Sequence, residues 1–152
     1  MRRGIHIMAI YEVLEAAAKL KTKKEKVQFL KDNDSLALRD ILKIGIDKSI
    51  KCLFPPGPPP YTPAESEPYR DIEKITRKWA QWCTWQGKPN DNVPMVKRES
   101  SFIAALESVH PQEAELMLRA KDKALILPNG TAFYKGVTKK VVEEAFPNLI
   151  VK

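Results

Sequence analysis

The run Phe54–Pro63 constrains the fold of this chain more than any other stretch of its sequence. It holds half of the chain's 12 prolines. Because proline lacks a backbone N–H and fixes φ, neither a helix nor a central strand can continue through the run. We expect an extended, polyproline-like strap between two helical halves. Two interpretations remain open: the strap lies across its own domain with Phe54 and Tyr61 as anchors, or it docks into a partner's aromatic groove.

The sequence before the strap predicts three helices. Apolar residues recur at helical spacing from Ile10 to Leu20, with charged residues between them. Thr22, followed three residues later by Glu25, forms a capping box that starts a second helix. The turn Asn33–Ser35 then starts a third helix, which carries an apolar face.

The sequence after the strap predicts four more helices. Pro68 opens the fourth, which we expect to run to about Trp85. The fifth begins at Lys97 and Arg98, and the sixth begins with Pro111 after a break at His110. Thr138 is the N-cap of the seventh. The buried face of the fourth helix would comprise Ile72, Ile75, Trp79 and Trp82. We interpret these tryptophans as core residues and not as a base-stacking platform, with Trp85 the one most exposed.

Together these patterns predict an all-α fold, an irregular bundle of about seven helices interrupted by the proline-rich strap. The chain has 152 residues, and we expect residues 9–152 to form one domain. Residues 1–8 are interpreted as a non-native leader, because Met8-Ala9 makes an ordinary translation start. Without that leader, the net charge of +7 would fall to +5 through the loss of Arg2 and Arg3.

The positive net charge favours an anionic partner, since clustered lysines and arginines attract polyanions and release their counterions. Charge alone leaves nucleic acid, acidic protein and membrane surface open. No run of about 18 apolar residues occurs, so we expect no membrane span. Cys52 and Cys83 are interpreted as free thiols of a reducing compartment. With two histidines far from the cysteines, we expect neither a metal site nor a cofactor.

The segment around the seventh helix suits a phosphate. Gly136 lets backbone N–H groups approach a ligand closely, and the amides of a helix start carry partial positive charge. Lys135, Lys139 and Lys140 add full charges. The alternative is that Gly136 only makes a turn and Thr138 only caps a helix.

Two further groups of basic residues are candidates for phosphate contact. Lysines gather where the first two helices join, where the alternative is a solvated corner. Lys97 and Arg98 are secondary candidates, because cations at a helix start oppose the helix dipole unless an anion binds there. The lysines at the first joint are Lys19, Lys21, Lys23, Lys24 and Lys26.

The outer thirds of the chain resemble a known domain. Residues 116–125, LMLRAKDKAL, and residues 135–150, KGVTKKVVEEAFPNLI, resemble the end of the N-terminal helical DNA-binding domain of ATP-dependent DNA ligases. Residues 10–54 are similar to the opening of bacteriophage versions of that domain. The whole chain also resembles an uncharacterised family of tailed, myovirus-like phages, in which PPPY, KRE and HPxEA recur in this order.

This resemblance implies a phage-encoded accessory protein of the host cytoplasm that holds double-stranded or nicked DNA through backbone phosphates. It implies that the lysine corner faces the duplex and that Arg119 is a supporting donor. The predicted contacts are Lys21, Thr22, Lys23, Lys24, Arg119, Lys135, Gly136, Thr138, Lys139 and Lys140.

We predict no enzymatic activity. A ligase needs a nucleophilic lysine in a Lys-x-Asp-Gly context, and the nearest string, Lys121-Asp122-Lys123-Ala124, lacks the glycine. Neither a phosphate-binding Gly-x-x-x-x-Gly-Lys loop nor a paired-histidine metal motif occurs. The alternative function is a phage protein-interaction or virion module that binds a phage or host replication protein through the strap or Trp85. The form of nucleic acid, the oligomeric state and the stage of infection stay open.

Overall fold

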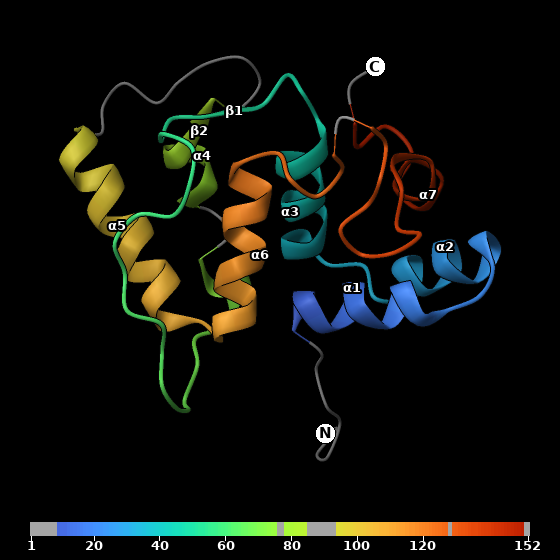
Figure 1. Cartoon of the computed structure of the whole chain (residues 1–152), viewed down its shortest axis with the longest axis horizontal. Helices are drawn as coiled ribbons and strands as arrows, with labels where there is room; N and C mark the ends of the chain where they lie inside the picture. The colour runs from blue at the N-terminus through green and yellow to red at the C-terminus, as the bar shows by residue number, and fades with distance from the viewer. Residues whose placement is uncertain (1–8, 76–77, 85–93, 128, 151–152) are drawn as a thin grey trace.

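The computed structural model describes residues 9–75, 78–84, 94–127 and 129–150, which form seven α-helices and one two-stranded sheet (Figure 1). The predicted all-α architecture is therefore confirmed. The predicted leader and Trp85 lie outside the described residues. The elements are α1 (Ile10–Lys19), α2 (Lys23–Asp32), α3 (Leu36–Ile46), β1 (Lys51–Cys52), the 3-10 turn η1 (Ile72–Lys74), α4 (Trp79–Trp82), β2 (Cys83–Thr84), α5 (Met95–Ser108), α6 (Pro111–Lys121) and α7 (Lys139–Ala145).

Most helices begin where the capping residues predict. Thr22 Oγ1 accepts from the Glu25 amide at 3.1 Å, and the Glu25 carboxylate accepts in return from the Thr22 amide. The side chains of Ser35 and Thr138 cap α3 and α7, each by accepting from an early amide of its helix. Pro111 is the first residue of α6 and directly follows the N-cap residue His110.

The predicted helix from Pro68 to Trp85 is wrong. The described part of this segment contains η1, the four-residue α4 and the strand β2, which pairs antiparallel with β1. The segment is rich in β-branched and aromatic residues, which lose side-chain freedom in a helix and favour a strand. The predicted buried set is nevertheless correct, because Ile72, Ile75, Trp79 and Trp82 are all buried.

The proline strap lies across its own domain. The Phe54 ring stacks on Phe102 of α5 at a centroid distance of 4.7 Å. Lys121 Nζ, at the end of α6, donates to the carbonyl oxygens of Pro55 at 2.9 Å and Gly57 at 3.0 Å. Tyr61 also packs partly buried against the core. Of the two interpretations drawn from the sequence, the structure therefore has the first, in which Phe54 and Tyr61 anchor the strap to its own domain.

The helices pack in two groups around a central pair (Figure 1). The central pair is α3 and α6, with α4 and α5 on one side and α1, α2 and α7 on the other. Gly45 of α3 leaves room where the central pair meets, since a Cβ there would stand 3.4 Å from Ala120 Cα of α6 and 2.9 Å from Cγ of Leu125, which follows α6. Because α2 and α7 lie side by side, the two outer thirds of the sequence meet at one end of the molecule.

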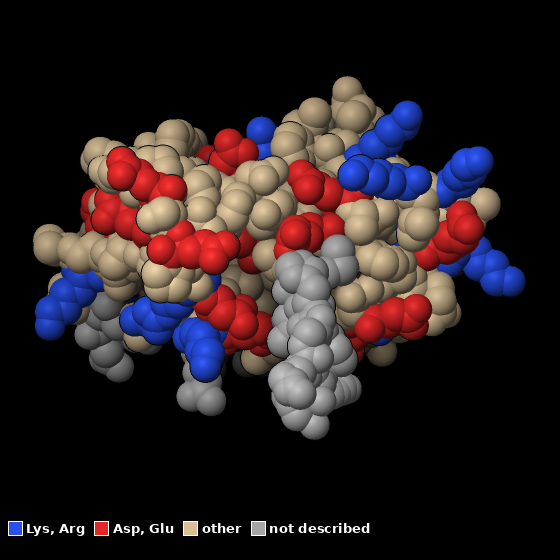
Figure 2. All heavy atoms as spheres, turned by 90° about the horizontal axis from the view of Figure 1, so that it is seen from below, with Lys and Arg blue, Asp and Glu red and all other residues tan. Residues whose placement is uncertain are grey.

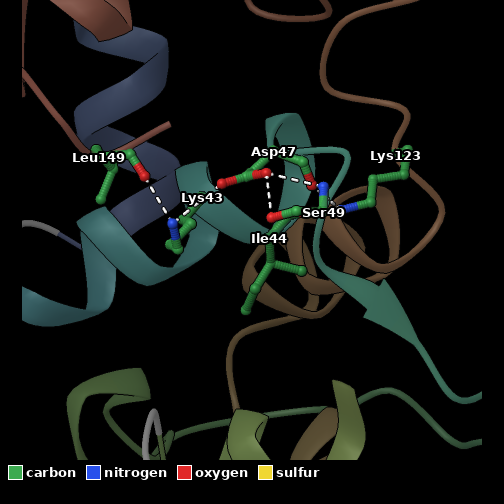
Figure 3. A network of polar contacts seen from close by, with 6 residues as sticks. All are labelled: Lys43, Ile44, Asp47, Ser49, Lys123 and Leu149. Carbon is green, nitrogen blue, oxygen red and sulfur yellow. Dashed lines mark hydrogen bonds and ion pairs between the residues drawn. The ribbon is translucent and has the colours of Figure 1, made fainter. Parts of the chain in front are cut away.

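Several lysines bind the protein's own carbonyls. At the end of α3, Lys43 Nζ donates to the Leu149 carbonyl at 2.7 Å and pairs with the buried Asp47 carboxylate at 3.0 Å (Figure 3). Lys123 Nζ donates to the carbonyls of Ile44 and Asp47 in the same network. Cations are favourable at helix C-termini, so these lysines stabilise the end of α3 and are not available to a partner.

Candidate nucleic-acid interface

The contact between α2 and α7 brings two groups of predicted site residues to one end of the molecule. Lys23 of α2 forms an ion pair with Glu144 of α7. Both side chains are about half exposed, at 52% and 53%, so this pair adds little stability. Its value here is positional, since it places the corner Lys21–Lys24 beside the helix that begins with Lys139 and Lys140. We call this end of the molecule the lysine end; its exposed lysines are Lys19, Lys21, Lys23, Lys24, Lys135, Lys139 and Lys140.

Gly136 lies in a turn, as one of its two interpretations predicted, and the Val137 amide donates to the Tyr134 carbonyl at 2.9 Å across it. It has φ +78°, and a Cβ at this position would stand 2.6 Å from Lys26 Cε. The space that a ligand would have needed on that side is therefore occupied by Lys26. Gly136 is required because the chain passes closely over another side chain in a left-handed conformation.

Lys26 is buried and does not belong to the exposed corner. Its Nζ donates to the carbonyl oxygens of Ala17 at 3.1 Å and Ala18 at 3.2 Å, and also to that of Leu20. These carbonyls belong to the end of α1, where a cation satisfies groups that lack helical partners. The predicted corner from Lys21 to Lys26 therefore stops at Glu25, and Lys26 ties α1, α2 and the Gly136 loop together.

The start of α7 carries only positive charge in its first turn. Thr138 Oγ1 accepts from the Val141 amide at 3.3 Å, so the predicted cap is confirmed. Lys139 and Lys140 follow it directly and are exposed. No acidic side chain of α7 stands in this turn to offset the positive end of the helix dipole.

Arg119 lies near the end of α6 and packs against the loop that leads to α7. Its guanidinium carbon stands 3.6 Å from the centroid of the Phe133 ring. Phe133 is 45% exposed and comes two residues before Lys135. Next to it, burial raises the pKa of Tyr134 well above its usual range. Arg119 is therefore held by a cation–π contact at the edge of the lysine end.

The secondary candidates lie elsewhere. Lys97 and Arg98 belong to the first turns of α5, which begins two residues before Lys97 at Met95. Figure 1 places α5 on the opposite side of the central helices from α7. Arg98 is buried, at 8% exposure, whereas Lys97 is exposed. The structure therefore does not bring this pair together with the lysine end.

The lysine end is not uniformly basic. In Figure 2, lysine and arginine side chains project at the end that carries α2 and α7, with acidic side chains between them. Glu144 pairs with Lys23, and Glu25 is used in the capping box of α2. Other basic side chains project at the opposite end in the same view. The convergence of two segments thus brings lysines together at this end, and carboxylates moderate their charge locally.

A second cluster, which sequence reasoning missed, lies at the start of α1. Glu113 of α6 is buried and accepts from the amides of Ile10 at 3.1 Å and Tyr11 at 2.7 Å. The Tyr11 ring stacks on His110 at 4.9 Å, beside an open pocket of about 520 Å³. Because the carboxylate is bound to first-turn amides of α1, its role is to cap that helix across the fold. No local sequence signal identifies a cap that comes from 102 residues away.

The ionisation of Glu113 should make stability pH-dependent. Burial raises the pKa of Glu113 to about 7 from 4.5, although its backbone hydrogen bonds lower it. A folded-state pKa above the unfolded value gives stability that is full below about pH 4.5 and lost as pH rises through about 7. We expect the unfolding free energy of wild type, relative to Glu113→Gln, to fall by about 3 kcal/mol across this range.

Urea denaturation at the two ends of that pH range measures this difference. The matched control is Glu115→Gln, which removes an exposed carboxyl group from the same helix in place of a buried one. Parallel pH profiles for wild type and Glu113→Gln would contradict the assignment.

The described residues hold no group of three or more His, Cys, Asp or Glu placed to bind a metal ion. In the same residues, no helix has the length and apolar character that a membrane span requires.

Comparison with known proteins gives one family. Residues 13–127 match the family described as "Family of unknown function (DUF6433)". No curated protein and no solved structure matches the chain.

Proposed function

This chain belongs to DUF6433, a family of unknown function, and we propose that it is a non-enzymatic DNA-binding protein. In this proposal it holds the backbone of intact or nicked duplex DNA through phosphates. It would act as a phage accessory protein similar to a free-standing ligase DNA-binding domain, in the cytoplasm of the host and beside a phage or host replication protein.

The observation that carries the proposal is the packing of α2 against α7. Residues more than a hundred positions apart in the sequence, such as Lys23 and Lys139, are thereby placed on adjoining helices. Lysines from two segments can contact phosphates that are several nucleotides apart, as a duplex backbone requires. The fixed joint beneath them, made by Lys26 and Gly136, keeps the two segments in register with each other.

The chemistry of the lysine end favours phosphate over base edges. Lysine is a point charge with three donors and gives strong but undirected contact to phosphate. Phosphate contacts position a protein without reading sequence. We therefore expect affinity that depends weakly on DNA sequence and strongly on salt.

Fluorescence anisotropy with nicked duplex, intact duplex and single-stranded oligonucleotides, each at two salt concentrations, tests the proposal. Tighter binding to either duplex than to the single strand, weakened by salt, is the expected result. Equal and negligible binding to all three would reject the proposal and leave the protein-interaction module. The outward prolines of the strap are exposed on that alternative surface.

Reversing the charge at the start of α7 should remove binding. We expect Lys139→Glu with Lys140→Glu to abolish detectable duplex binding near about 0.15 M salt. Where binding remains measurable at low salt, the slope of log affinity against log salt should be shallower by about 2. Helicity should be unchanged, because both side chains are exposed.

The matched control is Lys74→Glu with Lys97→Glu, which makes the same change of charge at exposed positions on η1 and α5. Its affinity should fall much less than that of the α7 variant. Equal losses in the two variants would indicate a response to net charge and would reject the lysine end as the contact surface.

A further inference from the structure

The two cysteines of the chain face each other across the small sheet. Cys52 of β1 and Cys83 of β2 are directly opposite in the antiparallel register, although 31 positions separate them in the sequence. Their Sγ atoms stand 2.9 Å apart as free thiols. The sequence predicted free thiols but gave no reason to expect them in contact.

The position of the pair in the ladder suits a covalent bond. The Leu53 amide donates to the Trp82 carbonyl at 2.8 Å, so the next residues along form a hydrogen-bonded pair. Cys52 and Cys83 therefore occupy a non-hydrogen-bonded pair, in which the Cα atoms are about 4.5 Å apart and the side chains are closest. That spacing falls within the range of Cα–Cα distances in disulfide bonds, so the strands are close enough for the bond to form.

The surroundings divide the two thiols into an attacking and a resolving group. The pKa of Cys52 is lowered by a hydrogen bond from the Cys83 thiol and by the nearby charges of Lys123 and Lys121, against the effect of burial. The pKa of Cys83 is raised by the hydrogen bond with Cys52 and by burial. Cys52 is also partly exposed whereas Cys83 is fully buried, so an oxidant reaches Cys52 first.

We propose that Cys52 and Cys83 form a thiol-oxidation site, at which a peroxide closes a reversible disulfide that ties β1, just before the proline strap, to β2, just after α4. Both lysines near the pair are held in place by hydrogen bonds to backbone carbonyls. Lys121 donates to a carbonyl of the strap, and Lys123 donates to a carbonyl at the end of α3. The positive environment of Cys52 is thus built into the fold.

The reaction balances with hydrogen peroxide as the oxidant. The Cys52 thiolate attacks one peroxide oxygen, the O–O bond breaks, and the departing hydroxide takes a proton to become water. The resulting Cys52 sulfenic acid is attacked by Cys83 sulfur, the S–O bond breaks, and the S–S bond forms. The Cys83 proton and the released hydroxide make a second water. In a reducing compartment, small thiols reverse the bond by thiol–disulfide exchange, so the closed state is transient.

The disulfide would close a loop from Cys52 to Cys83, which contains the proline strap. A disulfide over this span removes freedom from the unfolded chain, and we expect the thermal midpoint to rise by about 10 °C. The lysine end lies on the other side of the central helices (Figure 1), so the site is independent of the proposed DNA contact.

The test uses the full chain treated with hydrogen peroxide, then unfolded in guanidinium with N-ethylmaleimide. We expect neither cysteine to be alkylated, a non-reducing peptide map that links the Cys52 and Cys83 peptides, and two alkylated cysteines after dithiothreitol. Two alkylated cysteines before reduction, a link only between two copies, or Cys52 over-oxidised with Cys83 still alkylated would overturn the proposal. The Cys52→Ser variant should show no peroxide-dependent change in thermal midpoint; the same rise in that variant would also overturn it.

Discussion

Lys26→Met is expected to lower the free energy of unfolding by about 3 kcal/mol. The side chain is 7% exposed, and its ammonium donates to the carbonyls of Ala17, Ala18 and Leu20. Methionine keeps most of the apolar stem but supplies no donor. Three buried or partly buried carbonyls at the negative end of α1 then lose their partner, which costs more than the loss of one exposed hydrogen bond.

Urea denaturation followed by circular dichroism measures the change. Lys24→Met is the matched control, since Lys24 is on the same helix and is exposed. That control should stay within about 0.5 kcal/mol of wild type. A Lys26→Met protein as stable as the control would show that the three carbonyls are satisfied without the ammonium.

Local sequence signals predict the helices that have caps. Thr22, Ser35 and Thr138 each place a side-chain oxygen on an early amide of their helix, and each helix begins as expected. Pro63 and the prolines before it likewise predict the extended strap. These features are encoded within a few residues, so they can be inferred without knowledge of the fold.

The segment from Pro68 to Trp85 shows the limit of periodicity. Apolar residues at helical spacing correctly predict which side chains are buried, but not the backbone conformation that buries them. The conformation depends on the pairing of Cys83 with Cys52, which precedes the strap in the sequence. Pairing between distant strands has no local signal, so neither the sheet nor the thiol contact could be inferred.

The candidate site was predictable only in part. The exposed lysines of both outer thirds are visible in the sequence, whereas their meeting depends on the packing of α2 against α7. Local chemistry also cannot distinguish an exposed lysine from a buried one. Lys26, Lys43, Lys121 and Lys123 all bind the protein's own carbonyls, so the net charge overstates what a partner can contact.

Glycine at position 136 illustrates the same limit. A glycine before a capped helix predicts either a turn or a ligand approach, and both use the missing side chain. The structure has the turn and adds a further use, because the missing Cβ also leaves room for the stem of Lys26. The residue that shares the space comes from α2, far away in the sequence, so the role of Gly136 follows from the joint and not from its own neighbourhood.

Gly136→Ala is therefore expected to lower the free energy of unfolding by about 3 kcal/mol, for two separable reasons. The positive φ of 78° is unfavourable for any residue with a Cβ. The new Cβ would also stand 2.6 Å from Lys26 Cε and 3.2 Å from its Nζ, so Lys26 would have to leave the carbonyls of α1. Chemical denaturation of the variant measures the sum.

Two controls separate these reasons. Gly130 has φ +89° with nothing within 4 Å of its Cβ position, so Gly130→Ala reports the backbone cost alone, expected at about 1 kcal/mol. In the Lys26→Met background the side chain is no longer held by the carbonyls and can move aside, so Gly136→Ala should cost only about 1–2 kcal/mol there. If Gly136→Ala costs as much in the Lys26→Met background as it does in wild type, the coupling between the two positions is zero and the joint is wrongly assigned.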